Sequence, residues 1–292
     1  MMNLLTGAVG NLNSMDYMKR ASAPSALLSP QSFTPPEQAA GDSVSLSDNA
    51  MKALGGNGDE PGSELNSLQN DWSLNPFDNF RKLRSAFQYR DKEGPDAFGQ
   101  GQEGNCSTVA VTKAAMDAFG EGVFKKDDYD SATGAHSLEL RDGTSLQVSK
   151  EDYETAQKNS HFEGAGGRDE EYATLCYSAV AKNLMQTNGY KDMQQACDDL
   201  NDGFYPRESA KLLGLEGDMK DIDSSAITPA GIKEDELKKH DAIVGWSSGH
   251  HAIYIDNDKK EGLQSDHYGT ALKYDGTDTW ENKYLTDAFA LK

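Results

Sequence analysis

With 292 residues, the chain is long enough for one sizeable core, or for a domain of about 200 residues with a tail. Its net charge of −20 argues against sequence-independent binding to nucleic acid and against attraction to anionic membranes. No uninterrupted apolar run approaches the roughly 20 residues that cross a bilayer, so we expect no membrane span.

Residues 1–70 differ in composition from the rest of the chain. They are rich in Ser, Gly, Asn and Pro, and Pro35-Pro36 and Gly55-Gly56-Asn57-Gly58 interrupt regular structure. We expect a disordered leader, with a role in secretion or as a pro-segment. The first residues lack the basic segment and the long apolar core of a secretory signal peptide. Residues 71–292 are expected to form the folded domain, and self-cleavage of the leader is one hypothesis.

The first elements expected after the leader are helical. An amphipathic helix is predicted over residues 78–89, and a polar loop over residues 91–99 follows it. The Ala-rich segment Cys106–Phe119 is predicted as a helix, which Gly120 ends because glycine tolerates the left-handed C-cap conformation. The acidic stretch Glu121–Asp130 is predicted as a loop.

A β-hairpin gives the strongest signal in the middle of the chain. Two alternating runs within Ser137–Val148 flank the turn residues Asp142-Gly143. Ser149 is a favourable N-cap residue for a helix that follows it, and Glu151 and Asp152 lie in the first turn of that helix. Further helices or helical stretches are predicted at residues 169–187, 191–200, 208–215 and 232–240.

The end of the chain changes to strand character. Ala242–Trp246 and His251–Asp256 are apolar runs, Asn257–Gly262 is the turn that follows, and Leu263–Ala271 is the next strand. Helices first and an antiparallel sheet last indicate an α+β fold.

The stretch Gln100-Gly-Gln-Glu-Gly-Asn-Cys106 is where we expect the chemistry. Cys106 lies in the first turn of the predicted helix, where free N–H groups and the helix dipole favour a thiolate over a thiol. The Gln100 amide can fold back beside the sulfur and, with the Cys106 N–H, form an oxyanion hole. Gly101 and Gly104 let the intervening loop turn tightly. The alternative is that Cys106 is a small buried hydrophobe, which is how we interpret Cys176 and Cys197.

A cysteine nucleophile needs a base, and the base needs an orienting partner. His251 begins a hydrophobic strand in which it shares one face with Ile253 and Ile255. Asp266 lies one hairpin later, where it could accept from the His251 ring and fix its tautomer. The alternatives are His250 as base, and His267 or Asp256 as orienting group. Asp256 is less favoured, because five residues along one strand carry it roughly 17 Å away.

These residues resemble the papain-like cysteine peptidases, and most of all the calpain branch. Gln100-Gly-x-x-Gly-Asn-Cys106 is similar to the Gln-Gly-x-x-Gly-Asp-Cys pattern that leads the catalytic helix of that branch, with Asn105 in place of Asp. His251-Ala252 is similar to the His-Ala that carries the family's base. Asp266-His-Tyr-Gly269 takes the place of Asn-x-Trp-Gly, and an Asp there is seen in papain-like bacterial effector proteases. Ser107 stands where the family has a tryptophan.

The resemblance covers roughly residues 85–274 and implies a papain-like fold, with a helical half that contains a central Cys-bearing helix and a half made of antiparallel sheet. It implies a cysteine endopeptidase that acts on a protein or peptide through a thioester, without a cofactor. Cys106 would be the nucleophile, His251 the base, Asp266 the orienting group and Gln100 an oxyanion donor. It also favours a bacterial effector or toxin, cytoplasmic or exported without a standard secretory signal peptide.

Three other functions fit the same sequence. Deamidation or transglutamination of a glutamine would use the same site, because it passes through the same thioester. A non-catalytic binding protein on a decayed peptidase scaffold is the second. A calcium-regulated enzyme, by analogy with calpains, rests only on the acidic composition, since no EF-hand loop of the Asp-x-Asp-x-Asp-Gly kind occurs. The oligomeric state and the substrate sequence are not indicated.

Overall fold

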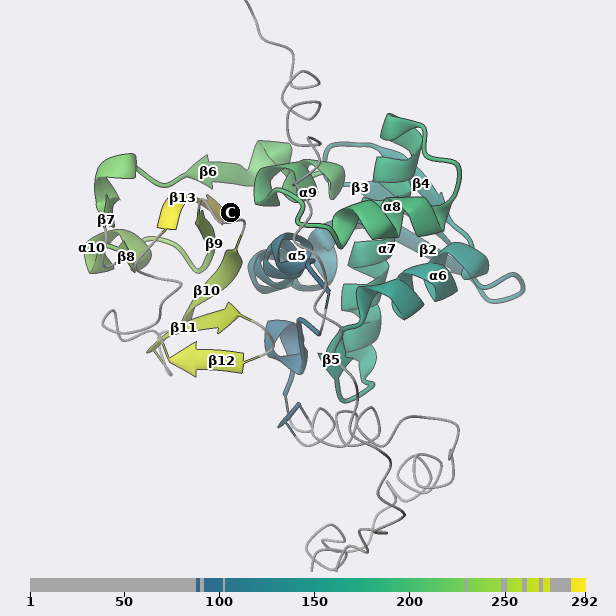
Figure 1. Ribbon diagram of the computed structural model, residues 1–292. Helices are drawn as coiled ribbons and strands as arrows, with labels where there is room; N and C mark the ends of the chain where they lie inside the picture. The colour runs from purple at the N-terminus through teal and green to yellow at the C-terminus, as the bar shows by residue number, and fades with distance from the viewer. Residues whose placement is uncertain are drawn as a thin grey trace, which may run out of the picture. The chain divides into compact units, whose positions relative to one another are not determined.

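The computed structural model describes residues 88–89, 92–101, 103–228, 231–247, 251–258, 262–267, 270–273 and 285–292 (Figure 1). All of them lie in the second of two compact units, Gly62–Lys292. The leader predicted over residues 1–70, and nearly all of the helix predicted over residues 78–89, lie outside the described residues.

The described chain is a mixed α+β fold with antiparallel sheets, as the sequence predicted. Its α-helices are α5 (Cys106–Phe119), α6 (Lys150–Ser160), α7 (Arg168–Asn188), α8 (Met193–Leu200), α9 (Pro206–Leu212) and α10 (Glu234–Leu237). Short 3₁₀ turns are η1 (Gly94–Ala97), η2 (Gly120–Val123), η3 (Glu216–Asp218) and η4 (Ser224–Ala226). Among the described residues, no helix combines the length and the apolar character that a bilayer crossing requires.

The larger sheet has six strands in the order β12-β11-β10-β9-β13-β6, and neighbouring strands pair antiparallel. A second sheet has the order β2-β3-β4, and two short pairs are β1-β5 and β7-β8. The strands are β1 (Phe98–Gly99), β2 (Phe124–Asp130), β3 (Ala135–Leu140), β4 (Ser145–Val148), β5 (Glu163–Gly164), β6 (Met219–Asp221), β7 (Ile227–Thr228), β8 (Gly231–Ile232), β9 (Ala242–Ser247), β10 (Ala252–Asp258), β11 (Gly262–His267), β12 (Thr270–Lys273) and β13 (Leu285–Leu291).

Helix α5 is the central element of this fold. Every residue from Cys106 to Met116 is buried, because the helix contacts β9 and β10 of the larger sheet as well as α7 and α9 (Figure 1). Its small alanine and valine side chains let these neighbours approach closely from several sides. The predicted end at Gly120 is confirmed, and its N–H donates to the Met116 carbonyl. Its φ of +54° and ψ of −126° differ from the left-handed helical conformation that was predicted, but they too suit a glycine.

The larger sheet carries a core on each face. Along β10, Ala252 and Tyr254 pack into the core that includes α5 and α7, whereas Ile253 and Ile255 pack into a second, smaller core. This alternation follows from the two-residue period of a strand. It confirms that Ile253 and Ile255 share a face, which is the face opposite to α5. His251 was predicted to share that face, but it precedes β10, so the strand period does not fix the direction of its side chain.

The hairpin over Ser137–Val148 is confirmed, with Gly143 at a φ of +92° in its turn. The prediction of a loop over Glu121–Asp130 is wrong, because Phe124–Asp130 forms β2 and pairs with β3. Only Phe124 of this strand is buried, so the charged side chains show no alternation that would reveal it. The loop predicted over residues 91–99 also contains regular structure, η1 and β1.

Candidate active site

Cys106 is the first residue of α5, as predicted, and its side chain is buried with 7% of the residue exposed. The residue before it, Asn105, is buried and donates from Nδ2 to the Ser160 carbonyl at 2.8 Å. This bond attaches the start of α5 to the end of α6, and so fixes the position of the Cys106 backbone.

The sulfur of Cys106 lies against the start of β10. The Ala252 N–H donates to Cys106 Sγ at 3.4 Å, a contact that joins residues 146 positions apart in the sequence. His251, the residue that precedes the donor, is partly buried, and its carbonyl accepts from the Ser247 N–H at 2.9 Å. The fold therefore brings together the two sequence motifs that were predicted to share a site, through a contact between the Cys106 side chain and the backbone of the residue after His251.

The environment of the sulfur has two opposing effects on its pKa. Burial raises the pKa of the Cys106 thiol, whereas the N–H groups of Ala252, Ser107 and Cys106 and the Ser107 hydroxyl stabilise the thiolate and lower it. Burial is the larger effect, so the pKa is raised. The N–H groups at the start of α5 thus act in the predicted direction, but burial outweighs them, and the sequence does not show how completely the sulfur is removed from water.

Gln100 is buried directly after β1, and its Nε2 donates to the Glu103 carbonyl at 2.5 Å. One N–H of the amide is thus used to close the loop that leads to Cys106, and an amide nitrogen carries two. Its role as an oxyanion donor stays a prediction.

Gly101 and Gly104 are required in this loop for a different reason from the predicted tight turn. Neither has a positive φ. A Cβ at Gly101 would collide with the His161 carbonyl oxygen, and a Cβ at Gly104 would lie 2.5 Å from the Asn201 carbonyl oxygen. The loop passes so close to these two backbone segments that a side chain has no room.

Lys113 is a buried residue near the candidate site that was not predicted from the sequence. It is buried two turns beyond Cys106 in α5, and its ammonium group donates to the carbonyls of Pro95 and Phe98, the latter at 2.5 Å. It also lies 4.6 Å from the Phe98 ring centroid. These contacts attach η1 and β1, and hence the segment that carries Gln100, to the helix that carries Cys106.

The structure describes the backbone of Asp266 in β11, where it lies opposite Tyr254 of β10. Tyr254 is three positions beyond His251, so Asp266 is about 10 Å along the strand from the level of His251. His267 pairs with Thr270 of β12, and Asp256 is partly buried near the end of β10. His250 lies outside the described residues. The identity of the orienting group stays a prediction.

Cys176 and Cys197 are buried and form no disulfide. Burial raises the pKa of the Cys176 thiol, and it raises that of Cys197 to about 12, which suits the structural role predicted for both. Within the described part of the chain, no group of His, Cys, Asp and Glu side chains is arranged to hold a metal ion.

Comparison of the chain with protein-family models, with curated proteins and with solved structures finds no match. The function is therefore argued from the geometry of the site.

Proposed function

We propose that the chain is a cysteine-type acyl-transfer enzyme of the papain-like kind that hydrolyses peptide bonds. The contact between Cys106 Sγ and the Ala252 N–H carries the proposal, because it sets His251 next to the residue that touches the sulfur. A central helix that begins with the cysteine and packs against an antiparallel sheet that contains the histidine strand supports it further. The substrate is a protein or peptide, and the setting of a bacterial effector is carried over from the resemblance alone.

The raised pKa of Cys106 determines how the nucleophile is activated in this proposal. Because the resting side chain is a thiol, His251 accepts the proton as the sulfur attacks the substrate carbonyl, and no preformed ion pair is needed. The carbonyl electrons move to oxygen, where the Cys106 N–H and the Gln100 amide stabilise the charge. Collapse expels the amine, which takes the proton from His251. Water, activated by His251, then hydrolyses the thioester to a carboxylic acid.

The test is covalent labelling by a peptidyl epoxide, followed by intact mass and peptide mapping. We expect a single adduct on Cys106, lost in Cys106→Ala and unchanged in the matched control Cys197→Ala. Removal of a general base costs about 10²- to 10⁴-fold in rate, so His251→Ala should lower the labelling rate by about that factor. Asp266→Ala should lower it less, because an orienting group acts through the base.

Two results would end the proposal. One is an adduct on Cys176 or Cys197 in place of Cys106, and the other is an unchanged labelling rate in His251→Ala. If labelling behaves as expected, a mixture of glutamine-containing peptides then decides the reaction. New peptide termini identify a peptidase, whereas a mass gain of about one dalton without cleavage identifies a deamidase, which would use the same thioester.

A further inference from the structure

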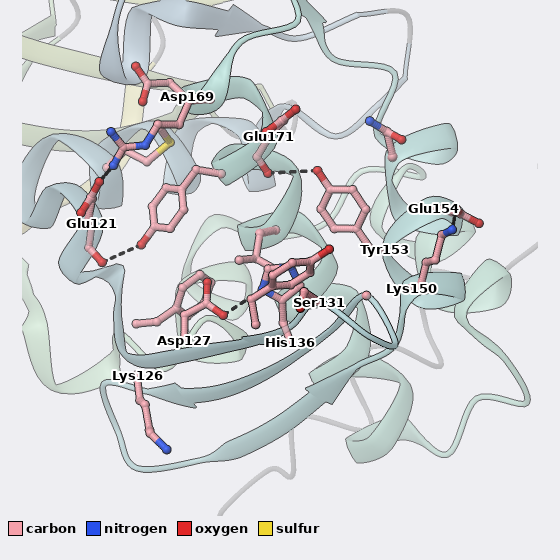
Figure 2. Close-up of a pocket in the computed structure, with 18 of the residues that line it drawn as sticks. Glu121, Lys126, Asp127, Ser131, His136, Lys150, Tyr153, Glu154, Asp169 and Glu171 are labelled. Atoms are coloured by element: carbon pink, nitrogen blue, oxygen red, sulfur yellow. Dashed lines mark hydrogen bonds and ion pairs between the residues drawn. The ribbon is translucent and has the colours of Figure 1, made fainter.

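A cavity of about 1170 Å³ lies between the β2–β3 hairpin, α6 and the start of α7 (Figure 2). We call it the hairpin pocket. Cys106 and His251 do not line it. Met116 does, and it is ten residues beyond Cys106 in α5, or about 15 Å along the helix. The hairpin pocket is therefore separate from the candidate active site.

One wall of the hairpin pocket is a row of three rings, in which His136 is tilted by 43° to Tyr129 and stacked at 25° to Tyr153. The His136 ring centroid lies 4.8 Å from that of Tyr129 and 6.2 Å from that of Tyr153. Tyr129 is 60% exposed, and among the described residues Tyr205 is the other exposed large aromatic side chain. Tyr172, in edge-to-face contact at 5.7 Å with the buried Phe124, is a further aromatic side chain of the wall. The pocket thus offers flat π faces to whatever enters it.

Hydrogen bonds hold the rings of Tyr153, Tyr172 and His136 in place, and the Asp127 carboxylate keeps the capacity to accept a further hydrogen bond. Tyr153 donates to the Glu171 carbonyl at 3.3 Å, and Tyr172 donates to the Glu121 carbonyl at 2.9 Å (Figure 2). Burial and the nearby charge of Glu171 raise the pKa of Tyr153 to about 12, so it stays a neutral donor. Asp127 Oδ1 lies 2.8 Å from His136 Nδ1, and a carboxylate with two oxygens keeps further acceptor capacity.

Carboxylates exceed cations by one among the side chains that line the hairpin pocket. The five carboxylates are those of Glu121, Asp127, Glu154, Asp169 and Glu171, against the four cations Lys125, Lys126, Lys150 and Arg168. Three of the cations are already paired at the exposed rim, in the ion pairs Arg168–Glu121, Lys150–Glu154 and Lys126–Asp128. Figure 2 shows Lys126 pointing away from the other labelled residues, whereas Asp127 lies beside His136. Asp127 is the carboxylate that contacts these rings, through His136, and its side chain is 31% exposed.

We propose that the hairpin pocket binds an arginine side chain presented by a protein or peptide. A guanidinium is flat and weakly hydrated, so it stacks on aromatic faces such as those of Tyr129 and Tyr153. Its N–H groups donate to a carboxylate, and Asp127, which contacts His136 through one oxygen, would accept from it through its remaining acceptor capacity. The cavity is far larger than one side chain, so residues that flank the arginine fit as well. This site would hold a partner or substrate protein away from Cys106.

The experiment uses the full chain with Cys106→Ala, so that peptide turnover cannot interfere. The probe is a fluorescein-labelled heptapeptide of alanine and glycine with one central arginine, and the reference peptide has citrulline there, which keeps the shape without the charge. A single positive charge limits non-specific attraction to a chain of net charge −20. We expect saturable one-to-one binding by fluorescence anisotropy, at least tenfold tighter for arginine than for citrulline.

Matched variants localise the binding. Asp127→Asn should weaken arginine binding at least tenfold, whereas Asp128→Asn, the same charge change at the next residue, should change it less than twofold. Asp128 does not line the pocket, and its side chain is 60% exposed. Tyr129→Ala, at an exposed position that the fold tolerates, should weaken binding several-fold. Its control is Tyr205→Ala, which removes the other large exposed aromatic side chain among the described residues.

Three outcomes would overturn the proposal: no saturable binding, equal affinity for the citrulline peptide, or equal losses in Asp127→Asn and Asp128→Asn, which would indicate bulk charge alone. Far-UV circular dichroism checks the fold of each variant. Because binding is measured without the nucleophile, these outcomes do not depend on whether Cys106 is catalytic.

Discussion

Burial raises the pKa of Cys106, and hydrogen bonds to its sulfur lower it. The pH dependence of its reaction with a small alkylating reagent shows which effect is larger. The pKa of Cys106 is raised, so neutral pH lies below it. In that range the thiolate fraction falls about tenfold for each unit by which the pH is lowered. We therefore expect the alkylation rate of Cys106 by iodoacetamide to rise about tenfold per unit between pH 6 and 8. The slope is the relevant quantity, because burial also slows access of the reagent at every pH.

N-acetylcysteine in the same buffers gives the reference slope of an ordinary thiol. If alkylation of Cys106 instead shows a plateau at pH 5 to 6 that disappears in His251→Ala, a thiolate–imidazolium pair exists. The activation by general base that we propose would then be replaced by the ion pair that the sequence suggested.

The positions of Cys106 and His251 could be predicted because each lies at the start of a regular element with a clear pattern. A glycine-broken loop precedes the Ala-rich helix, and a continuous apolar run follows His251. The role of Lys113 could not be predicted in the same way. A lysine within a helix is most often solvated, and only the packing of η1 and β1 over α5 shows that this one is buried against two carbonyls.

At the scale of elements, α6 and α7 are joined through one carboxylate. Asp152 accepts from the Ser149 backbone N–H in a capping box and from Lys182 of α7 at 2.8 Å. Burial alone would raise the pKa of Asp152, but the hydrogen bonds from Lys182 and Ser149 outweigh it and lower the pKa. A lowered pKa in the folded state means that this carboxylate stabilises the fold above the pKa of the unfolded chain.

Asp152→Asn should therefore lower the free energy of unfolding by about 1–2 kcal/mol at pH 7. The difference from the wild type should narrow as the pH falls toward the lowered pKa of Asp152, where the wild-type side chain is protonated too. Urea denaturation at a series of pH values from 7 downward measures the loss of stability at pH 7 and its change with pH. Glu151→Gln, an exposed change in the same helical turn, is the control, with an effect within about 0.5 kcal/mol. A difference that does not vary with pH would rule out the charge as its cause.

The loop that leads into α5 depends on close backbone contact. Gly101→Ala would place a Cβ against the His161 carbonyl, so we expect a loss of stability of about 1–3 kcal/mol and slower labelling of Cys106. Gly217→Ala is the control, because its Cβ would meet no atom within 4 Å. Thermal unfolding and the epoxide labelling rate measure the two effects. Equal behaviour of the two variants would show that the loop adapts to a side chain.

Hairpins and capped helices were predictable because their signals are local, as in Asp142-Gly143 and Ser149. Strands β2 and β13 were not predicted, for two different reasons. Nearly all residues of β2 are exposed, so its sequence has no apolar period, and only its pairing with β3 makes it a strand. The place of β13 between β9 and β6 is set by distant parts of the chain, which local sequence does not specify.

At the scale of the whole described domain, the larger sheet is shared by two cores. Alternate residues of β9, β10 and β13 point into one core or the other: Val244 and Phe289 belong to the larger, and Ile243 and Ala290 to the smaller. Loss of either core would expose one face of the same three strands to water. The cores are therefore expected to unfold together.

Truncation of one leucine in each core tests this expectation. Leu184 lies in α7 and the larger core, and Leu237 lies in α10 and the smaller core; both are buried. Each change to alanine should lower the free energy of unfolding by about 2–5 kcal/mol. In both variants, far-UV circular dichroism and tryptophan fluorescence should still report one common denaturant transition. The reason is that the same strands form part of both cores, so loss of one core destabilises the strands of the other. A Leu237→Ala variant that loses part of its signal in a separate, earlier transition would show that the smaller core unfolds independently and that the strands near His251 are stabilised mainly by their contacts with α5.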